Sequence, residues 1–300
     1  MVAHKQAVLI LAHNNIEQLI ILASLLNEYF KIFIHFDKKT YFKYPKSLKN
    51  CLETLPNVFV YSQYKVHWGA FSIVEATILL ASESLKHKDI EYFHLISGLD
   101  WITKNPEEIY QYFMQNDSIY MTYESAENVV KGQQGEQCVL LWQKFYYPYD
   151  IINRRSTFGK FFHHGNMIMQ KILRIDKLKH FKISFPLYIG SEWWSMPREP
   201  LEYVCSCCAE QQNIIKVMRS GFCSDEFLFQ TILYNSEKYK KKIKNENFRF
   251  ILWKQKYDSY PAILDDADYE LIKNSGAFFM RKVDFEISSS LLSKLGVKHK

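Results

Sequence analysis

The chain has 300 residues, of which 48% are hydrophobic and 23% charged, and its formal net charge is +6. This composition is ordinary for a globular protein, and no apolar run approaches the roughly 20 residues that cross a bilayer. Nucleic-acid binding is disfavoured, because no helix-turn-helix, zinc-finger or RNA-binding aromatic pattern accompanies the positive charge. Without a signal-peptide pattern at the N-terminus, we expect a cytoplasmic protein.

The first third of the chain alternates strand and helix patterns. Strands are predicted over residues 7–12, 31–37, 57–61 and 92–96, and helices over residues 16–29 and 72–85. Ser72 and Glu75 have the spacing of a capping box at the start of the second helix. Strands that alternate with helices indicate βαβ units, so we expect an α/β fold with a mostly parallel sheet.

Polar residues follow three of these strands. His13, Asp37 and Asp100 come just after the apolar runs, and ligands of open α/β sheets bind beyond the carboxyl ends of strands. No glycine-rich phosphate loop follows the first strand, which argues against dinucleotide enzymes and NTPases. Nucleotide-sugar enzymes remain, since they can hold the nucleotide through strand-end side chains.

Residues 124–184 are less regular and are predicted to form a helical insertion. Between residues 151 and 184, eight lysines and arginines stand against one acid, Asp176, among many apolar residues. Such a stretch favours an anionic membrane surface or an acidic acceptor, although a solvated face on an ordinary helix pair fits equally well. Cys205, Cys207 and Cys208 lack zinc-site spacing, so we expect reduced core cysteines there.

The last third returns to short strands, predicted at residues 187–189 and 248–253, with helices that begin near Asp225 and Asp266. We expect a single domain over residues 1–300. Its parts are a nucleotide-binding part at about 1–123, the insertion, an acceptor and catalytic part at about 185–285, and a C-terminal tail at 286–300.

Six segments, in order, resemble one family. They are residues 34–39 (IHFDKK), 66–72 (VHWGAFS), 93–100 (FHLISGLD), 190–195 (GSEWWS), 224–230 (SDEFLFQ) and 278–282 (FFMRK). Together they resemble the core-2/I-branching β-1,6-N-acetylglucosaminyltransferase family, glycosyltransferase family 14, which also includes peptide O-xylosyltransferases and bacterial relatives. The resemblance covers about residues 7–285. It implies a GT-A-like fold, a mostly parallel twisted sheet flanked by helices, and an inverting transfer from a UDP-sugar that gives a β-linkage.

Glu226 matches the catalytic base of this family. A base takes the proton from the acceptor hydroxyl as its oxygen attacks the anomeric carbon, and a helix N-terminus keeps a carboxylate ionised. A simple dipole-favoured acid is the alternative. The resemblance also implies that Lys282 binds the diphosphate, with Arg281 as a helper, in place of a metal. Asp266 and Asp268 have Asp-x-Asp spacing, but helix-start acids explain them better, so we expect neither metal nor cofactor.

One departure concerns a further diphosphate arginine of the animal members. Its place falls near Ser259 and Tyr260, where this chain has no arginine. Either Arg281, Lys254 or Lys256 substitutes for it, or phosphate binding is weaker.

The remaining site residues are also carried over from the resemblance. His13 and Asp37 match nucleotide contacts, and Asp100 is grouped with them as a strand-end acid. Trp253 matches an acceptor-side aromatic or is a buried strand-end tryptophan. The other acceptor candidates are Glu124 and the pair Trp193 and Trp194, for which core packing is an equal alternative.

The donor sugar is not readable from the sequence, because the family uses UDP-N-acetylglucosamine, UDP-xylose and UDP-glucuronate; N-acetylglucosamine is the best guess. The basic, apolar stretch favours a bacterial enzyme that acts on a glycan or lipid-linked glycan at the inner membrane face. The alternative function is a non-catalytic nucleotide-sugar or glycan-binding protein on the same fold. The presence of both Glu226 and Lys282 favours the enzyme.

Overall fold

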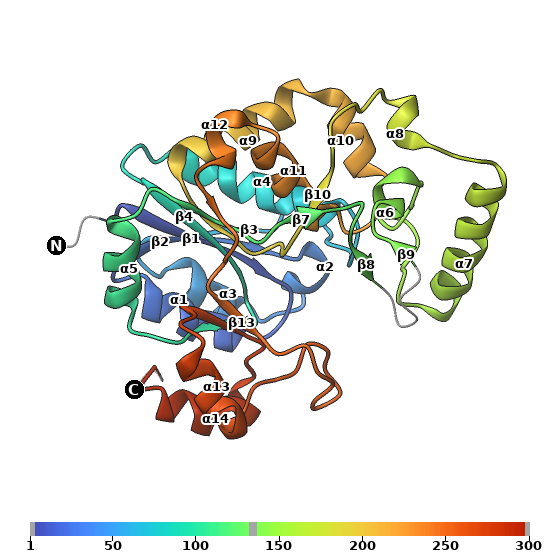
Figure 1. Cartoon of the computed structure of the whole chain (residues 1–300). Coiled ribbons are helices and arrows are strands. Elements are labelled where there is room, and N and C mark those ends of the chain that lie inside the picture. The colour runs from blue at the N-terminus through green and yellow to red at the C-terminus, as the bar shows by residue number, and fades with distance from the viewer. Residues whose placement is uncertain (1–3, 132–136, 298–300) are drawn as a thin grey trace.

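The computed structural model describes residues 4–131 and 137–297. A seven-stranded sheet forms the centre of the molecule, in the order β12-β6-β11-β4-β1-β2-β3 (Figure 1). The strands are β1 (Gln6–Ala12), β2 (Phe30–Phe36), β3 (Val58–Tyr61), β4 (Tyr92–Ser97), β6 (Ile119–Tyr120), β11 (Ser195–Pro197) and β12 (Ile243–Lys244). β11 runs antiparallel to β4 and β6, whereas β1 is parallel to β2 and β4. The predicted α/β architecture, a mostly parallel sheet flanked by helices, is confirmed.

Helices cover both faces of this sheet. α4 (Ser72–Leu85), α9 (Arg198–Glu210), α10 (Gln212–Arg219), α11 (Leu228–Tyr234) and α12 (Glu237–Lys240) lie on one side, and α1 (Ile16–Leu26), α3 (Lys46–Glu53) and α5 (Pro106–Met114) lie on the other (Figure 1). Ala7 and Leu9 join the apolar core on the α4 side, whereas Val8 and Ile10 join the core on the α1 side. A strand buried on both faces explains why β1 reads as one continuous apolar run.

Two helix predictions need correction. The first helix ends at Leu26 rather than near residue 29. The capping box predicted at Ser72 and Glu75 is wrong, because Phe71 is the N-cap residue of α4. The Ser72 hydroxyl instead accepts a hydrogen bond from the His67 backbone N–H at 3.0 Å, so it stabilises the preceding loop.

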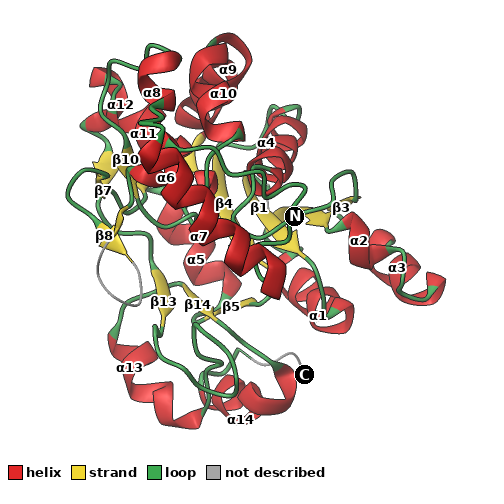
Figure 2. Ribbon diagram, turned by 90° about the vertical axis from the view of Figure 1, so that its right-hand side faces the viewer, coloured by secondary structure: helices red, strands yellow, loops and turns green. Residues whose placement is uncertain are grey.

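The insertion extends from one end of the molecule. It holds α6 (Leu141–Lys144), α7 (Thr157–Ile172) and α8 (Lys177–His180), together with the short strands β7 (Glu124–Ser125), β8 (Val130–Lys131) and β9 (Gln137–Cys138). β7 pairs with β10 (Tyr188–Ile189), where the chain leaves the insertion. Figure 2 views the molecule from this end and shows α7 as the outermost rod on that side. The stretch is mainly helical, as predicted, with short paired strands at its start, and its division from the rest of the chain as an insertion stays a prediction.

A second, smaller sheet lies below the central one in both views (Figures 1 and 2). It consists of β13 (Arg249–Ile251), β14 (Phe279–Arg281) and β5 (Asp100–Ile102), in that order. η2 (Asp266–Asp268), α13 (Tyr269–Asn274) and α14 (Phe285–Lys294) complete this part. α14 occupies much of the segment predicted as a tail, and its Leu291 and Leu292 are buried. Among the residues that the structure describes, no helix is both long and apolar enough to cross a membrane.

Candidate functional site

The ends of β1 and β2 place His13 and Asp37 side by side. Ala12 is the register partner of Phe36, and the Asp37 backbone N–H donates to the Ala12 carbonyl at 2.7 Å. The buried Asp37 carboxylate accepts hydrogen bonds from the backbone N–H groups of Lys39 at 2.9 Å and Val66 at 3.1 Å. Asp37 therefore joins the end of β2, which leads into α2 (Lys38–Tyr41), to the loop before Trp68.

His13 keeps exposed surface at the end of β1. Partial burial and the charge of Arg281 lower the pKa of His13, and Arg155 and Lys282 lower it further, whereas Asp37 raises it. Three cations and one acid thus act electrostatically on the imidazole. This is the electrostatic setting of an anion-binding site.

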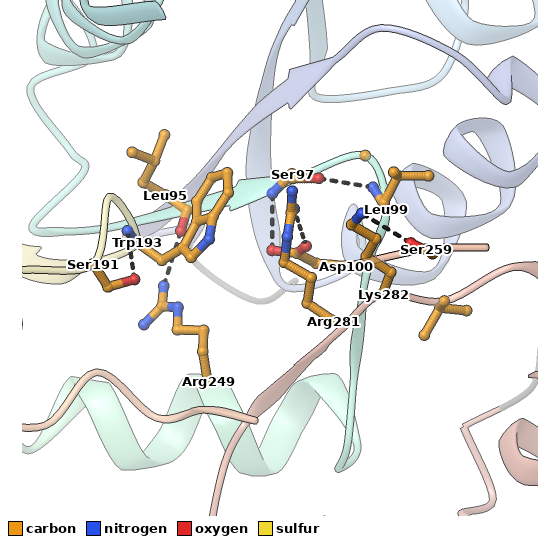
Figure 3. Close-up of polar contacts among 12 residues, drawn as sticks. Leu95, Ser97, Leu99, Asp100, Ser191, Trp193, Arg249, Ser259, Arg281 and Lys282 are labelled. Atoms are coloured by element: carbon orange, nitrogen blue, oxygen red, sulfur yellow. Dashed lines mark hydrogen bonds and ion pairs between the residues drawn. The ribbon is translucent and has the colours of Figure 1, made fainter. Parts of the chain in front are cut away.

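Arg281 lies at the centre of the site. Asp100 of β5 is its register partner in the smaller sheet, and the two side chains form an ion pair at 2.7 Å (Figure 3). The other Asp100 oxygen accepts a hydrogen bond from the Ser97 backbone N–H at 2.9 Å. The Arg281 guanidinium also lies 4.8 Å from the ring centre of Trp193. Asp100 has no exposed surface in this conformation. Its direct contact with a nucleotide stays a prediction, and its evident role is to orient Arg281.

Lys282 lies beside Arg281 at the wall of an open cavity of about 480 Å³, which we call the basic recess. The recess is lined by Trp68, Arg154, Arg155, Lys160, Asp258, Ser259, Tyr260 and Lys282. The Lys282 ammonium donates to the Ser259 hydroxyl at 3.0 Å and to the Tyr260 carbonyl at 3.3 Å. Burial and the charges of Arg281 and Arg155 lower the pKa of Lys282. Clustered cations of this kind favour an anionic ligand.

Glu226 lies in a short 3-10 turn, η1 (Ser224–Glu226), directly before Phe227 and α11. Its backbone N–H donates to the Cys223 carbonyl at 3.0 Å, and its carbonyl accepts from the Gly190 N–H at 2.9 Å. A Cβ atom on Gly190 would lie 1.9 Å from the Thr122 carbonyl oxygen, so only glycine fits there. The Glu226 turn is therefore held against the start of the GSEWWS segment.

Glu192 and Asp225 join Glu226 to form an acidic cluster, which sequence reasoning missed. Burial raises the pKa of Glu192 well above its usual value, as do the charge of Asp225, a hydrogen bond to it and the charge of Glu226, whereas Arg281 lowers it. Glu192 keeps some exposed surface, but its carboxyl group is enclosed by protein. Arg281 thus acts electrostatically on both His13, beside the cations, and Glu192, in the acidic cluster.

The predicted aromatic residues have different surroundings. Trp194 is fully buried against Phe229, with ring centres 5.0 Å apart, and Trp193 is 4% exposed; this burial fits the core-packing alternative. Trp253 is 62% exposed and lies 5.7 Å from Tyr260, so the alternative of a buried strand-end tryptophan is wrong. Glu124 is exposed on β7, where Ile189 is its register partner.

Arg249 is a further residue that the sequence reasoning did not identify. Its buried guanidinium donates to the Leu95 carbonyl at 3.0 Å (Figure 3). It also donates to the Ser195 hydroxyl at 2.9 Å and to the Trp194 carbonyl at 2.8 Å. Burial lowers the pKa of Arg249 to about 9. These bonds tie β13 to the segment that carries Glu192 and Trp193.

The predicted substitutes for the diphosphate arginine are not equivalent. Lys256 forms ion pairs with Asp265 at 2.7 Å and Asp268 at 2.8 Å, whereas Lys254 is exposed. Asp265 and Asp268 also form a capping box at η2, so the acids near Asp266 are helix-start acids, as predicted. Within residues 4–131 and 137–297, no group of three or more His, Cys, Asp and Glu side chains is arranged to hold a metal ion.

Comparison with known proteins identifies the family. The model of the Core-2/I-branching enzyme family matches residues 7–274. The chain belongs to this family of glycosyltransferases. It is also similar to beta-glucuronosyltransferase GlcAT14A of Arabidopsis thaliana, with 28% identity over 122 residues. These residues are 40% of this chain and 27% of the plant protein, so the chain matches only about a quarter of that relative.

Two solved structures share low similarity with this member of the Core-2/I-branching family. A WbbM bifunctional glycosyltransferase has a TM-score of 0.39 and 10% identity, over 96% of this chain and 49% of that chain. A structure from Bacillus anthracis, described as a glucose-1-phosphate thymidylyltransferase with sucrose, has a TM-score of 0.32 and 11% identity. That match covers 71% of this chain and 80% of the other.

Proposed function

We propose that the protein transfers a sugar, with N-acetylglucosamine as the first candidate, from a UDP-sugar to a hydroxyl group of a glycan, giving a β-linkage. The observation that supports this proposal is that the site has a cationic half and an acidic half, and that the charge of Arg281 acts on residues of both. Cations line the basic recess with Lys282, and Glu192 forms an acidic cluster with Asp225 and Glu226. A glycosyl transfer needs both halves, one for the leaving diphosphate and one for the incoming hydroxyl.

In the proposed reaction, Glu226 accepts the proton of the acceptor hydroxyl while that oxygen forms a bond to the anomeric carbon. The bond between the anomeric carbon and the diphosphate oxygen breaks at the same time, and UDP leaves with the electron pair. Lys282 stabilises the charge that develops on the diphosphate, and Asp100 holds Arg281 in place to assist it. His13 and Asp37 contact the nucleotide at the strand ends.

We place the acceptor at the exposed aromatic side of the recess. Trp253 presents its ring to solvent beside Tyr260, which itself lines the recess, so a sugar ring can stack there next to the diphosphate. Glu124 and Trp193 are the further acceptor-side candidates.

The acceptor that we propose is a lipid-linked glycan at an anionic membrane surface, reached through α7. Five apolar residues of α7 are between 52% and 74% exposed, and they fall on one side of the helix: Phe158, Phe161, Ile168, Met169 and Ile172. His163 and Met167 on the opposite side are buried. Lys160 and Lys171 border the exposed stripe, which gives the helix the pattern of an interfacial amphipathic helix.

Vesicle sedimentation tests this membrane contact. The wild-type protein should bind vesicles that contain anionic lipid more strongly than neutral ones, and the double variant Phe161→Ser, Ile168→Ser should lose that binding. Phe42→Ser is the matched control, because Phe42 is 69% exposed elsewhere on the surface. Failure of the wild-type protein to bind anionic vesicles at low salt would refute the contact.

Calorimetric titration with UDP in excess EDTA tests the donor site. We expect wild-type binding without added metal, weaker binding by Lys282→Ala, and unchanged binding by Lys244→Ala, which removes an exposed lysine on β12. Binding that requires manganese would show that the metal-independent mechanism is wrong and would return attention to Asp100 and Asp266.

A further inference from the structure

Arg155 stands on the turn that leads into α7 and lines the basic recess together with Lys282. Four cations and one acid line the recess, since Arg154 and Lys160 also contribute and Asp258 is the single carboxylate. Its volume of about 480 Å³ falls within the roughly 300–1,000 Å³ of typical small-ligand sites. The insertion therefore shares a wall of the cavity that contains the lysine assigned to the diphosphate.

Trp68 supports the Arg155 side chain. The Arg155 guanidinium carbon lies 4.8 Å from the Trp68 ring centre, and the Trp68 ring packs edge-on against Phe222 at 5.4 Å. Gly69 has φ +72°, and a Cβ atom there would lie 2.3 Å from the Phe222 ring, so the turn that carries Trp68 requires glycine. A guanidinium stacked on an aromatic face keeps its edge N–H groups available for bidentate contact with a phosphate.

The four cations of the recess face a single carboxylate, that of Asp258. Among residues 4–131 and 137–297, no carboxylate lies within ion-pair distance of Arg155, whereas Asp100 pairs with Arg281 and two acids pair with Lys256. Arg155 is close enough to lower the pKa of both His13 and Lys282. An anion in the recess would relieve this mutual repulsion.

Arg154 and Lys160 fit this role less well. The charge of Arg154 acts on Tyr147, Tyr149 and His163 inside the insertion, so its side chain serves that small core. Lys160 is a flexible ammonium on the exposed part of α7, without an aromatic support in the described structure. Arg155 combines the aromatic support with proximity to Lys282.

We propose that Arg155 binds the diphosphate of the nucleotide-sugar together with Lys282, so that the insertion completes the donor site. This inference rests on the proposed function. Arg155 then takes the role of the further diphosphate arginine, for which the sequence analysis had named Arg281, Lys254 and Lys256 as substitutes. Donor binding would also depend on the position of α7.

Calorimetry with two ligands, UDP and inorganic pyrophosphate, tests the assignment on the full-length protein in EDTA. Arg155→Gln should weaken the binding of both ligands by about tenfold or more, because it removes one charge-assisted contact. Arg155→Lys should fall between Arg155→Gln and wild type, because it keeps the charge but lacks the planar fork. Arg174→Gln is the matched control, since Arg174 is exposed near the end of α7 and does not line the recess. Circular dichroism checks that each variant is folded.

The two ligands separate this inference from the proposed function. If wild type binds pyrophosphate with a dependence on Arg155 but does not bind UDP, the recess assignment stands and the nucleotide proposal fails. If Arg155→Gln binds both ligands as wild type does while Lys282→Ala is weakened, Arg155 does not contact the diphosphate. Absence of pyrophosphate binding by wild type would also overturn the assignment.

Discussion

The parallel half of the sheet buries its side chains, whereas the insertion leaves many of its side chains exposed. β1, β2 and β4 bury nearly every residue, and the acids Asp37 and Asp100 at their ends are occupied by hydrogen bonds and ion pairs inside the protein. α7 instead leaves a stripe of large apolar residues exposed, and the turn before it presents Arg155 to a cavity. The difference teaches that the sheet fixes its acids through contacts inside the protein, whereas the insertion leaves apolar and basic side chains exposed.

Among the substitutions in the site, Asp100→Asn should cause the largest loss in the free energy of unfolding. The substitution leaves the mostly buried Arg281 without its carboxylate partner, and breaking such a pair costs about 3 kcal/mol or more of unfolding free energy. Urea denaturation measures the loss. Asp117→Asn is the control, because Asp117 pairs with Lys242 on the surface and should cost less than about 1 kcal/mol. Equal effects of the two substitutions would contradict the orienting role of Asp100.

Arg249→Met tests the second element of the scaffold. The variant removes the hydrogen bonds that the buried Arg249 guanidinium donates to the carbonyls of Leu95 and Trp194, and we expect a loss of about 2 kcal/mol in the free energy of unfolding. Arg219→Met removes an exposed ion pair with Glu75 and should change stability by less than about 1 kcal/mol. A similar stability for both variants would show that Arg249 is not a structural anchor.

Glu192→Gln should change how stability depends on pH. The folded protein raises the pKa of Glu192 above its usual value of 4.5, so it retains a proton that the unfolded chain releases. The stability from this group is present below pH 4.5 and is lost as the pH rises toward the folded-state pKa. Glutamine stays neutral, so the variant should lose less stability than wild type over that interval in denaturation at several pH values. Parallel curves for the two proteins would contradict the raised pKa.

The smallest effect should come from the exposed stripe of α7. Phe161→Ser combined with Ile168→Ser should leave the free energy of unfolding within about 0.5 kcal/mol of wild type, because neither side chain is buried. Leu9→Ala in β1 is the matched contrast and should cost about 2–5 kcal/mol. A large loss from the α7 double variant would mean that this face packs against the protein.

The sequence predicted those parts of the fold that depend on local pattern. The apolar run at residues 7–12 corresponds to β1, and the placement of His13 and Asp37 at one sheet edge followed from parallel pairing. The capping box at Ser72 failed because the hydroxyl has a competing partner, the His67 N–H, outside the helix. Local spacing alone could not reveal that competition.

The non-local parts of the site could not be predicted in this way. Asp100 and Arg281 are 181 residues apart and meet only through the register of β5 with β14. Glu192 lies within a recognisable segment, but its raised pKa depends on burial beside Asp225. Arg155 belongs to the basic stretch that the sequence analysis interpreted as a membrane or acceptor surface. Only the structure shows that Arg155 lines the same cavity as Lys282.

A comparison of wild type with Glu226→Gln in UDP release tests the central claim most directly. Each protein is given UDP-sugars, beginning with UDP-N-acetylglucosamine, together with a lipid-linked glycan acceptor. We predict that the variant binds UDP within about twofold of wild type but releases it from the sugar at least about 100-fold more slowly, because the acceptor hydroxyl loses its base. Release by Glu226→Gln at the wild-type rate would contradict the assignment of Glu226. A wild-type protein that binds UDP-sugars without ever releasing UDP would instead be a binding protein on this fold.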